Sequence, residues 1–142
     1  MVKQYQHTQI GYLTIVILSV AFLFILRLMK MNRFNWIGLV VLVILGFCFV
    51  LFVALTVIIK DDFLEIRHWV YKKRFSLKEI ASTKIVKNPW YYGWGIRLTP
   101  YGWLYNVSGF YAVEITMKNG KSYRIGTDNP NELEQAIRQS IE

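Results

Sequence analysis

Few residues in this 142-residue chain could bind a phosphate or act as an acid and a base. Gly93-Trp94-Gly95 has the beginning of a glycine-rich phosphate loop, but it lacks a third glycine, a Lys-Ser or Lys-Thr pair and a following helix. A sharp turn, in which glycine adopts positive φ without strain, explains these glycines better. His7 and His68 are far apart in the sequence and lack metal-ligand spacing.

No catalytic set can be assembled from the remaining residues. The single cysteine, Cys48, lies inside an apolar run, and the acidic residues are scattered over positions 61–142. Neither a Ser-His-Asp arrangement nor a catalytic pair of carboxylates can be assembled from them. The sequence therefore predicts a protein that is not an enzyme and that holds neither a cofactor nor a metal.

Basic residues follow the longest apolar run closely. Lys72-Lys73-Arg74 lies about a dozen residues beyond it, and a Lys or Arg near a bilayer contributes roughly 1 kcal/mol of attraction to anionic headgroups. The alternative is a solvated turn whose charges keep a strand edge from pairing. The residues predicted to contact the membrane interface or an anionic lipid are Lys60, Arg67, Trp69, Lys72, Lys73 and Arg74.

A dense group of aromatic residues follows between positions 90 and 111. A small core needs only part of this group, so we expect the rest to be exposed, where an aromatic patch indicates contact with a protein, a membrane or a ligand. Arg97 is either a buried arginine paired with a carboxylate such as Glu114 or an anion ligand. The predicted interaction surface consists of Trp90, Tyr91, Tyr92, Trp94, Arg97, Tyr101 and Trp103.

Two apolar runs place these groups beside a membrane. Residues 36–59 carry no charge, and a helix of that length reaches roughly 36 Å, which exceeds a hydrocarbon core of about 30 Å. Residues 10–26 form the first run, which extends to residue 29 if Arg27 snorkels. Basic residues rather than a signal-peptide cleavage site follow the first run, so we interpret it as a membrane anchor that is retained in the protein. We expect a transmembrane helical hairpin over 1–59, with spans at about 10–29 and 36–59, and one domain over 60–142.

The distribution of charge gives an orientation. Lys and Arg outnumber Asp and Glu by 17 to 9. The short connector between the runs carries Arg27, Lys30 and Arg33, whereas the other side carries twice as many basic residues near the spans. The positive-inside tendency predicts that both termini and the domain lie in the cytoplasm. The sequence is basic but contains no nucleic-acid-binding motif, so we expect no nucleic-acid partner.

The last 80 residues alternate in the manner of short strands. The cleanest amphipathic strand spans 110–118, and Asn119-Gly120 after it is a strong hairpin signal. Asn129, Pro130 and Glu132 then suit the start of a helix with an apolar stripe. We expect six or seven antiparallel strands and one C-terminal helix, an α+β domain in which a small bent sheet is closed by the helix.

Several short blocks in this region occur together in one family: GWGIR (93–97), GWLYNVSG (102–109), AVEI (112–115), NGK (119–121) and RIGTDNP (124–130). With these blocks, residues 60–142 resemble the membrane-associated bacterial PH-like domains, small modules often preceded by two transmembrane helices. The resemblance implies a multi-pass protein of the inner or plasma membrane of a bacterium. Its pleckstrin-homology-like barrel or sandwich would lie on the cytoplasmic side and could self-assemble. It implies neither a reaction nor phosphoinositide binding.

The sequence thus favours a membrane-anchored binding or scaffolding module. We expect its partners to be the lipid bilayer with its anionic headgroups, a partner protein, or further copies of itself. The alternative is a small oligomeric channel or transporter subunit with a regulatory cytoplasmic domain. The apolar runs carry no ionisable group apart from those at their ends, and ion or proton paths usually contain such groups.

Overall fold

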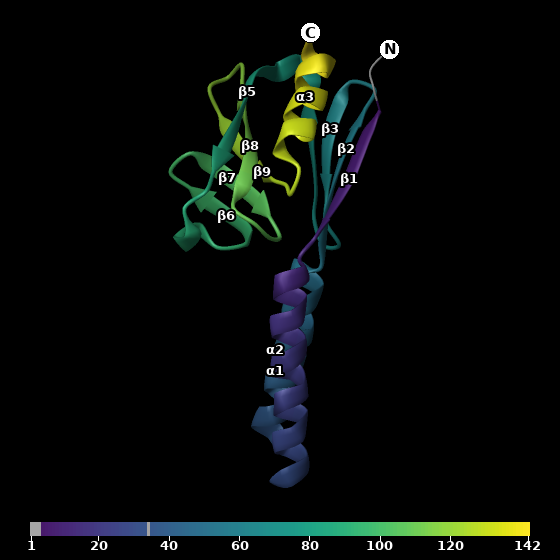
Figure 1. The fold of residues 1–142 in the computed structure, drawn as a ribbon, viewed down its shortest axis with the longest axis vertical. Helices are drawn as coiled ribbons and strands as arrows, with labels where there is room; N and C mark the ends of the chain where they lie inside the picture. The colour runs from purple at the N-terminus through teal and green to yellow at the C-terminus, as the bar shows by residue number, and fades with distance from the viewer. Residues whose placement is uncertain (1–3, 34) are drawn as a thin grey trace.

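The computed structural model describes residues 4–33 and 35–142, and it has the shape of a two-helix stalk that carries a β-rich head (Figure 1). Lys3, which counts among the basic residues near the N-terminus, lies outside the described residues. The elements in chain order are β1 (Tyr5–Ile10), α1 (Tyr12–Met31), α2 (Trp36–Phe52), β2 (Ala54–Lys60), β3 (Phe63–Arg67), β4 (Lys72–Ser76), η1 (Leu77–Glu79), β5 (Ile80–Lys87), η2 (Trp90–Tyr92), β6 (Gly95–Thr99), β7 (Gly102–Asn106), β8 (Tyr111–Met117), β9 (Ser122–Gly126) and α3 (Pro130–Ile141).

The prediction of one helix over 36–59 is wrong at its C-terminal end. Helix α2 ends at Phe52, and residues 54–60 form β2, which pairs with β1 on one side and β3 on the other. The segment is apolar but rich in β-branched residues, which favour strands, and two neighbouring strands satisfy its backbone. The first predicted span likewise begins too early, because Ile10 ends strand β1.

Both helices of the stalk therefore continue directly into paired strands. Ile10 pairs with Ala54 next to the stalk, and Tyr5 pairs with Ile59 at the other end of the ladder. The strand β1, which the sequence did not reveal, and the strand β2 make residues 5–10 and 54–60 part of the head sheet.

By length and composition, one helix in the described part of the chain is able to cross a membrane, namely α1 with 20 residues. Helix α2 is also apolar but has 17 residues. The corresponding lengths are roughly 30 Å and 25 Å. The two helices lie against each other along the stalk (Figure 1).

The strands of the head form two sheets, with the orders β1-β2-β3-β4 and β5-β8-β9-β7-β6. The predicted α+β class is confirmed, but the described strands do not close into a barrel. Strand β7 also pairs in parallel with β9, whereas we expected antiparallel strands throughout. The parallel pair arises because β8 and β9 form the predicted hairpin and β9 then receives β7 on its free edge.

The hydrophobic core lies between the two sheets and α3. Leu64 and Ile66 of β3 are fully buried on one side, and Val113 and Ile115 of β8 on the other. Aromatic side chains join the sheets at their edges: Tyr71 stacks on Tyr105 with ring centroids 5.7 Å apart, and Phe75 lies 4.7 Å from Tyr123.

The C-terminal helix and the turn before β9 were predicted correctly. Helix α3 begins at Pro130 and buries its apolar stripe, which consists of Leu133, Ala136 and Ile137. Gly120 has φ +86° in the turn after β8, a left-handed conformation that glycine adopts at little cost. Both features depend on local signals, namely a helix start and an Asn-Gly pair.

Candidate functional site

The end of the head nearest the stalk is held to the helices by polar contacts. His68, in the turn between β3 and β4, donates from Nε2 to the carbonyl oxygen of Leu51 at 2.6 Å. Gln9 donates from Nε2 to the carbonyl oxygen of Ser108 at 2.8 Å, which ties β1 to the loop after β7. Gly95 at the start of β6 approaches the ring of Phe52, the last residue of α2. Both sheets therefore meet the stalk at the same level.

Exposed aromatic side chains gather at this end. Trp69 follows His68 directly and is 77% exposed, and its neighbour Val70 is 60% exposed. In the other sheet, Trp90 on η2 is 79% exposed and Tyr91 is 65% exposed. Figure 1 shows the segment between β5 and β6 at the end of its sheet that faces the stalk. We call Trp69, Trp90 and Tyr91 the aromatic rim.

Trp94 belongs to the same end of the head but is only half-buried. Its Nε1 donates to the carbonyl oxygen of Gly109 at 3.2 Å. Together with Phe52, Ile96 and Val107 it lines a cavity of about 230 Å³ between the stalk and the β5–β9 sheet. This cavity is mainly apolar, and it opens beside the last turn of α2.

The predicted basic residues of β3 and β4 are organised by one carboxylate. Glu65 is nearly buried, and it accepts hydrogen bonds from Arg74 Nε at 2.6 Å and from Arg67 Nη2 at 2.7 Å. Lys72 Nζ lies 3.5 Å from the same side chain. The hydrogen bonds from Arg74 and Arg67 and the charge of Lys72 lower the pKa of Glu65 to about 2. One carboxylate among three cations leaves a net positive patch on the outer face of the sheet.

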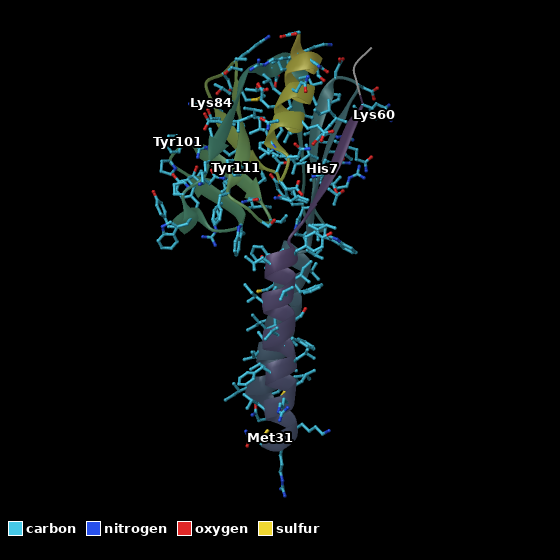
Figure 2. The ribbon with its side chains drawn as sticks, in the orientation of Figure 1. His7, Met31, Lys60, Lys84, Tyr101 and Tyr111 are labelled. Atoms are coloured by element: carbon cyan, nitrogen blue, oxygen red, sulfur yellow. The ribbon has the colours of Figure 1, made fainter. Side chains whose placement is uncertain are left out.

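Two of the predicted membrane-interface residues, Lys60 and Lys73, lie outside this positive patch. Lys60 ends β2 at the far side of the head from the stalk, because β2 runs away from α2 (Figure 2). Lys73 lies on the core side of β4, where its Nζ is 5.8 Å from the ring centroid of Phe75. Lys72, Lys73 and Arg74 belong to a strand and not to a turn.

The predicted pairing of Arg97 with Glu114 is wrong. Arg97 is exposed on β6, and its Nε donates to the carbonyl oxygen of Trp94 at 3.2 Å. Glu114 instead accepts from Nε of the buried Arg124 at 2.8 Å. The β8–β9 hairpin places Arg124 directly opposite Glu114, so this pair follows from the Asn-Gly turn that the sequence predicts.

No protein-family model matches this chain, and neither a curated protein nor a solved structure matches it significantly. What the chain binds therefore has to be argued from its own surface.

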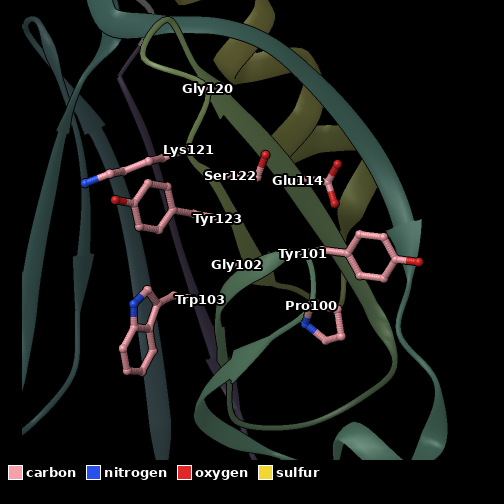
Figure 3. A pocket seen from close by; sticks show the side chains of 9 residues that line it. All are labelled: Pro100, Tyr101, Gly102, Trp103, Glu114, Gly120, Lys121, Ser122 and Tyr123. Atoms are coloured by element: carbon pink, nitrogen blue, oxygen red, sulfur yellow. The ribbon is translucent and has the colours of Figure 1, made fainter.

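A cavity of about 520 Å³ lies near the start of β7 and β9 (Figure 3). Trp103, Lys121 and Tyr123 point to one side of the sheet, and Tyr101 and Glu114 point to the other. Tyr101 covers the guanidinium of Arg124, whose carbon is 4.3 Å from the ring centroid. Two residues of this cavity, Tyr101 and Glu114, thus hold the guanidinium of Arg124.

Groups suited to metal binding or catalysis do not converge in the described part of the chain. It contains no cluster of three or more His, Cys, Asp or Glu side chains that could hold a metal ion. His7 lies next to Asp128, in the loop before α3, and His68 holds the stalk. The geometry supports contact with surfaces through exposed aromatic and basic side chains.

Proposed function

We propose that this chain is a membrane-anchored binding module of the PH-like kind, without enzymatic activity, whose head rests on the surface of the bilayer. One observation carries the proposal: exposed aromatic residues from two different sheets lie at the end of the head where the helices join it. Trp69 comes from the β3–β4 turn and Trp90 from η2. Because these segments are far apart in the sequence, their position at the same end of the head results from the fold.

The physical reason is the preference of tryptophan and tyrosine for the boundary between hydrocarbon and water. A helix pair of roughly 25–30 Å fits a hydrocarbon core of about 30 Å. With α1 and α2 inside the bilayer, the boundary falls at Gly11 and Val53, next to the aromatic rim. The strands above this level lie in water, where the polar outer face of the β1–β4 sheet is solvated.

Charge supports the same placement. Arg67 of β3 and Lys72 of β4 lie opposite each other in the strand register, at the end nearest the stalk. There they attract anionic headgroups. Arg74 lies one step further along the ladder, and Lys60 lies too far from the stalk to take part. The excess of basic residues on this side favours a cytoplasmic head and cytoplasmic termini.

Quenching of tryptophan fluorescence tests the proposal in the full chain. The chain is reconstituted in phosphatidylcholine vesicles whose acyl chains carry bromine near the headgroup. We expect the double variant Trp69→Phe/Trp90→Phe to lose a large part of the emission that bromine quenches. The matched variant Trp103→Phe, which alters a half-exposed tryptophan further from the stalk, should keep that part. Equal loss in the two variants would contradict the proposal.

A further inference from the structure

A notch at the end of β5 contains a buried polar group without a protein partner. The notch has a volume of about 420 Å³ and is lined by Lys87, Asn88, Pro89, Trp90 and Phe110. Trp90 and Phe110 are exposed, and they supply apolar walls. Asn88 is only 4% exposed, and the Nδ2 atom of its side chain has no hydrogen-bond partner among the described residues.

The orientation of the Asn88 amide is fixed by its neighbours. Its Oδ1 accepts from Arg124 Nη1 at 3.0 Å, and Glu114 holds the same guanidinium through Nε. Because a guanidinium only donates hydrogen bonds, the Nδ2 group cannot take the position of Oδ1. The backbone N–H of Asn88 donates to the carbonyl oxygen of Phe110 at 2.6 Å and fixes the position of the residue. The N–H donors of Nδ2 therefore have no acceptor in the described part of the chain.

A second donor lies beside the first. Lys87 is exposed, and in the described part of the chain it forms no ion pair with a carboxylate. Its Nζ lies 5.8 Å from the ring centroid of Tyr111, which is labelled in Figure 2. A notch whose lining combines a cation, an unpaired N–H donor and two aromatic rings suits an anionic acceptor attached to an apolar body.

We propose that this notch binds the phosphoryl group of an anionic lipid headgroup. One phosphate oxygen accepts from Asn88 Nδ2, a second faces Lys87 Nζ, and Trp90 and Phe110 contact the glycerol and upper acyl region. The inference rests on the proposed function, because Trp90 also belongs to the aromatic rim that meets the bilayer. Inorganic phosphate offers the same acceptors but leaves the two rings without a partner.

Native mass spectrometry of the full chain tests the assignment. The chain is released from detergent micelles that contain either phosphatidylglycerol or diacylglycerol with identical acyl chains, because diacylglycerol lacks the phosphoryl group, and the retained lipids are counted. The variants are Lys87→Gln and Asn88→Asp. Asn88→Asp keeps an acceptor for Arg124, so the fold is preserved, but it replaces the Nδ2 donor by a negative charge. Lys84→Gln is the matched control, because it removes the same charge from the same strand about 10 Å away.

We expect the native chain and Lys84→Gln to retain phosphatidylglycerol in excess over diacylglycerol. Each of the two notch variants should lower that excess by about tenfold, the effect of losing one charge-assisted hydrogen bond. Equal retention of both lipids by the native chain, or equal losses in Lys84→Gln, would overturn the assignment. Displacement of phosphatidylglycerol by millimolar inorganic phosphate would overturn the lipid as the source. Fluorescence quenching at the aromatic rim is independent of headgroup charge, so it separates a failure of the notch from a failure of the proposed function.

Discussion

His68 Nε2 lies 2.6 Å from the carbonyl oxygen of Leu51, so the β3–β4 turn is bonded to the last turn of the stalk. That carbonyl lies in the last turn of α2, where backbone carbonyl groups have no hydrogen-bond donor within the helix. His68 Nδ1 also accepts from the backbone N–H of Val70. One side chain thus connects the stalk, the turn and the exposed Trp69 beside it.

Removal of this side chain should loosen the head from the stalk. We expect His68→Ala to lower the free energy of unfolding by roughly 1–2 kcal/mol, because a buried carbonyl loses its donor. Thermal unfolding of the full chain in detergent measures the change. His68→Gln keeps an N–H donor and should retain part of the stability. A midpoint that is unchanged in His68→Ala would show that the contact does not hold the head.

Glu65 should make the stability of the head depend on acid. Its pKa is lowered to about 2 in the folded chain, mainly by the hydrogen bond from Arg74, from an ordinary value of 4.5. The stabilising effect of the carboxylate is therefore complete above about pH 4.5, and it is lost as the pH falls towards 2. Denaturant titrations between pH 6 and 2.5 should show this loss in the native chain and a smaller loss in Glu65→Gln. Parallel pH profiles for the two proteins would refute the role of the carboxylate.

Gly102 should tolerate substitution much less well than Gly120. Both have positive φ, which costs an L-residue roughly 1–2 kcal/mol. A Cβ at Gly102 would also lie against the backbone carbonyl of Ser122 on the paired strand β9, whereas a Cβ at Gly120 meets open space. We expect Gly120→Ala to lower the unfolding midpoint slightly and Gly102→Ala to disrupt the β7–β9 pairing. Comparable midpoints for the two variants would argue against the parallel pair.

Elements with strong local signals could be predicted from the sequence. The helix start at Asn129-Pro130 and the turn at Asn119-Gly120 specify their conformations within a few residues. The alternation before Asn119 likewise matches the buried face of β8. These signals act within a few residues and do not depend on contacts with distant parts of the chain.

Features that depend on distant pairing could not be predicted. Residues 54–60 are as apolar as the helix before them, and only their pairing with β1 and β3 makes them a strand. Most of the predicted basic residues follow the stalk closely in the sequence, but Lys60 lies far from the stalk because α2 ends at Phe52 and β2 runs away from it. Asn88 gives no signal in the sequence, since its unpaired amide appears only once Arg124 is in place.

The proposal that the two helices cross a bilayer is tested most directly from the two ends of the molecule. Met31 and Lys60 lie at opposite ends in Figure 2, and both are exposed. In a Cys48→Ala background, which removes the only thiol, Met31→Cys and Lys60→Cys are treated with a membrane-impermeant maleimide in sealed inside-out vesicles from producing cells. We expect Lys60→Cys to be labelled at once and Met31→Cys only after the vesicles are opened. Equal labelling of both positions in sealed vesicles would contradict the account.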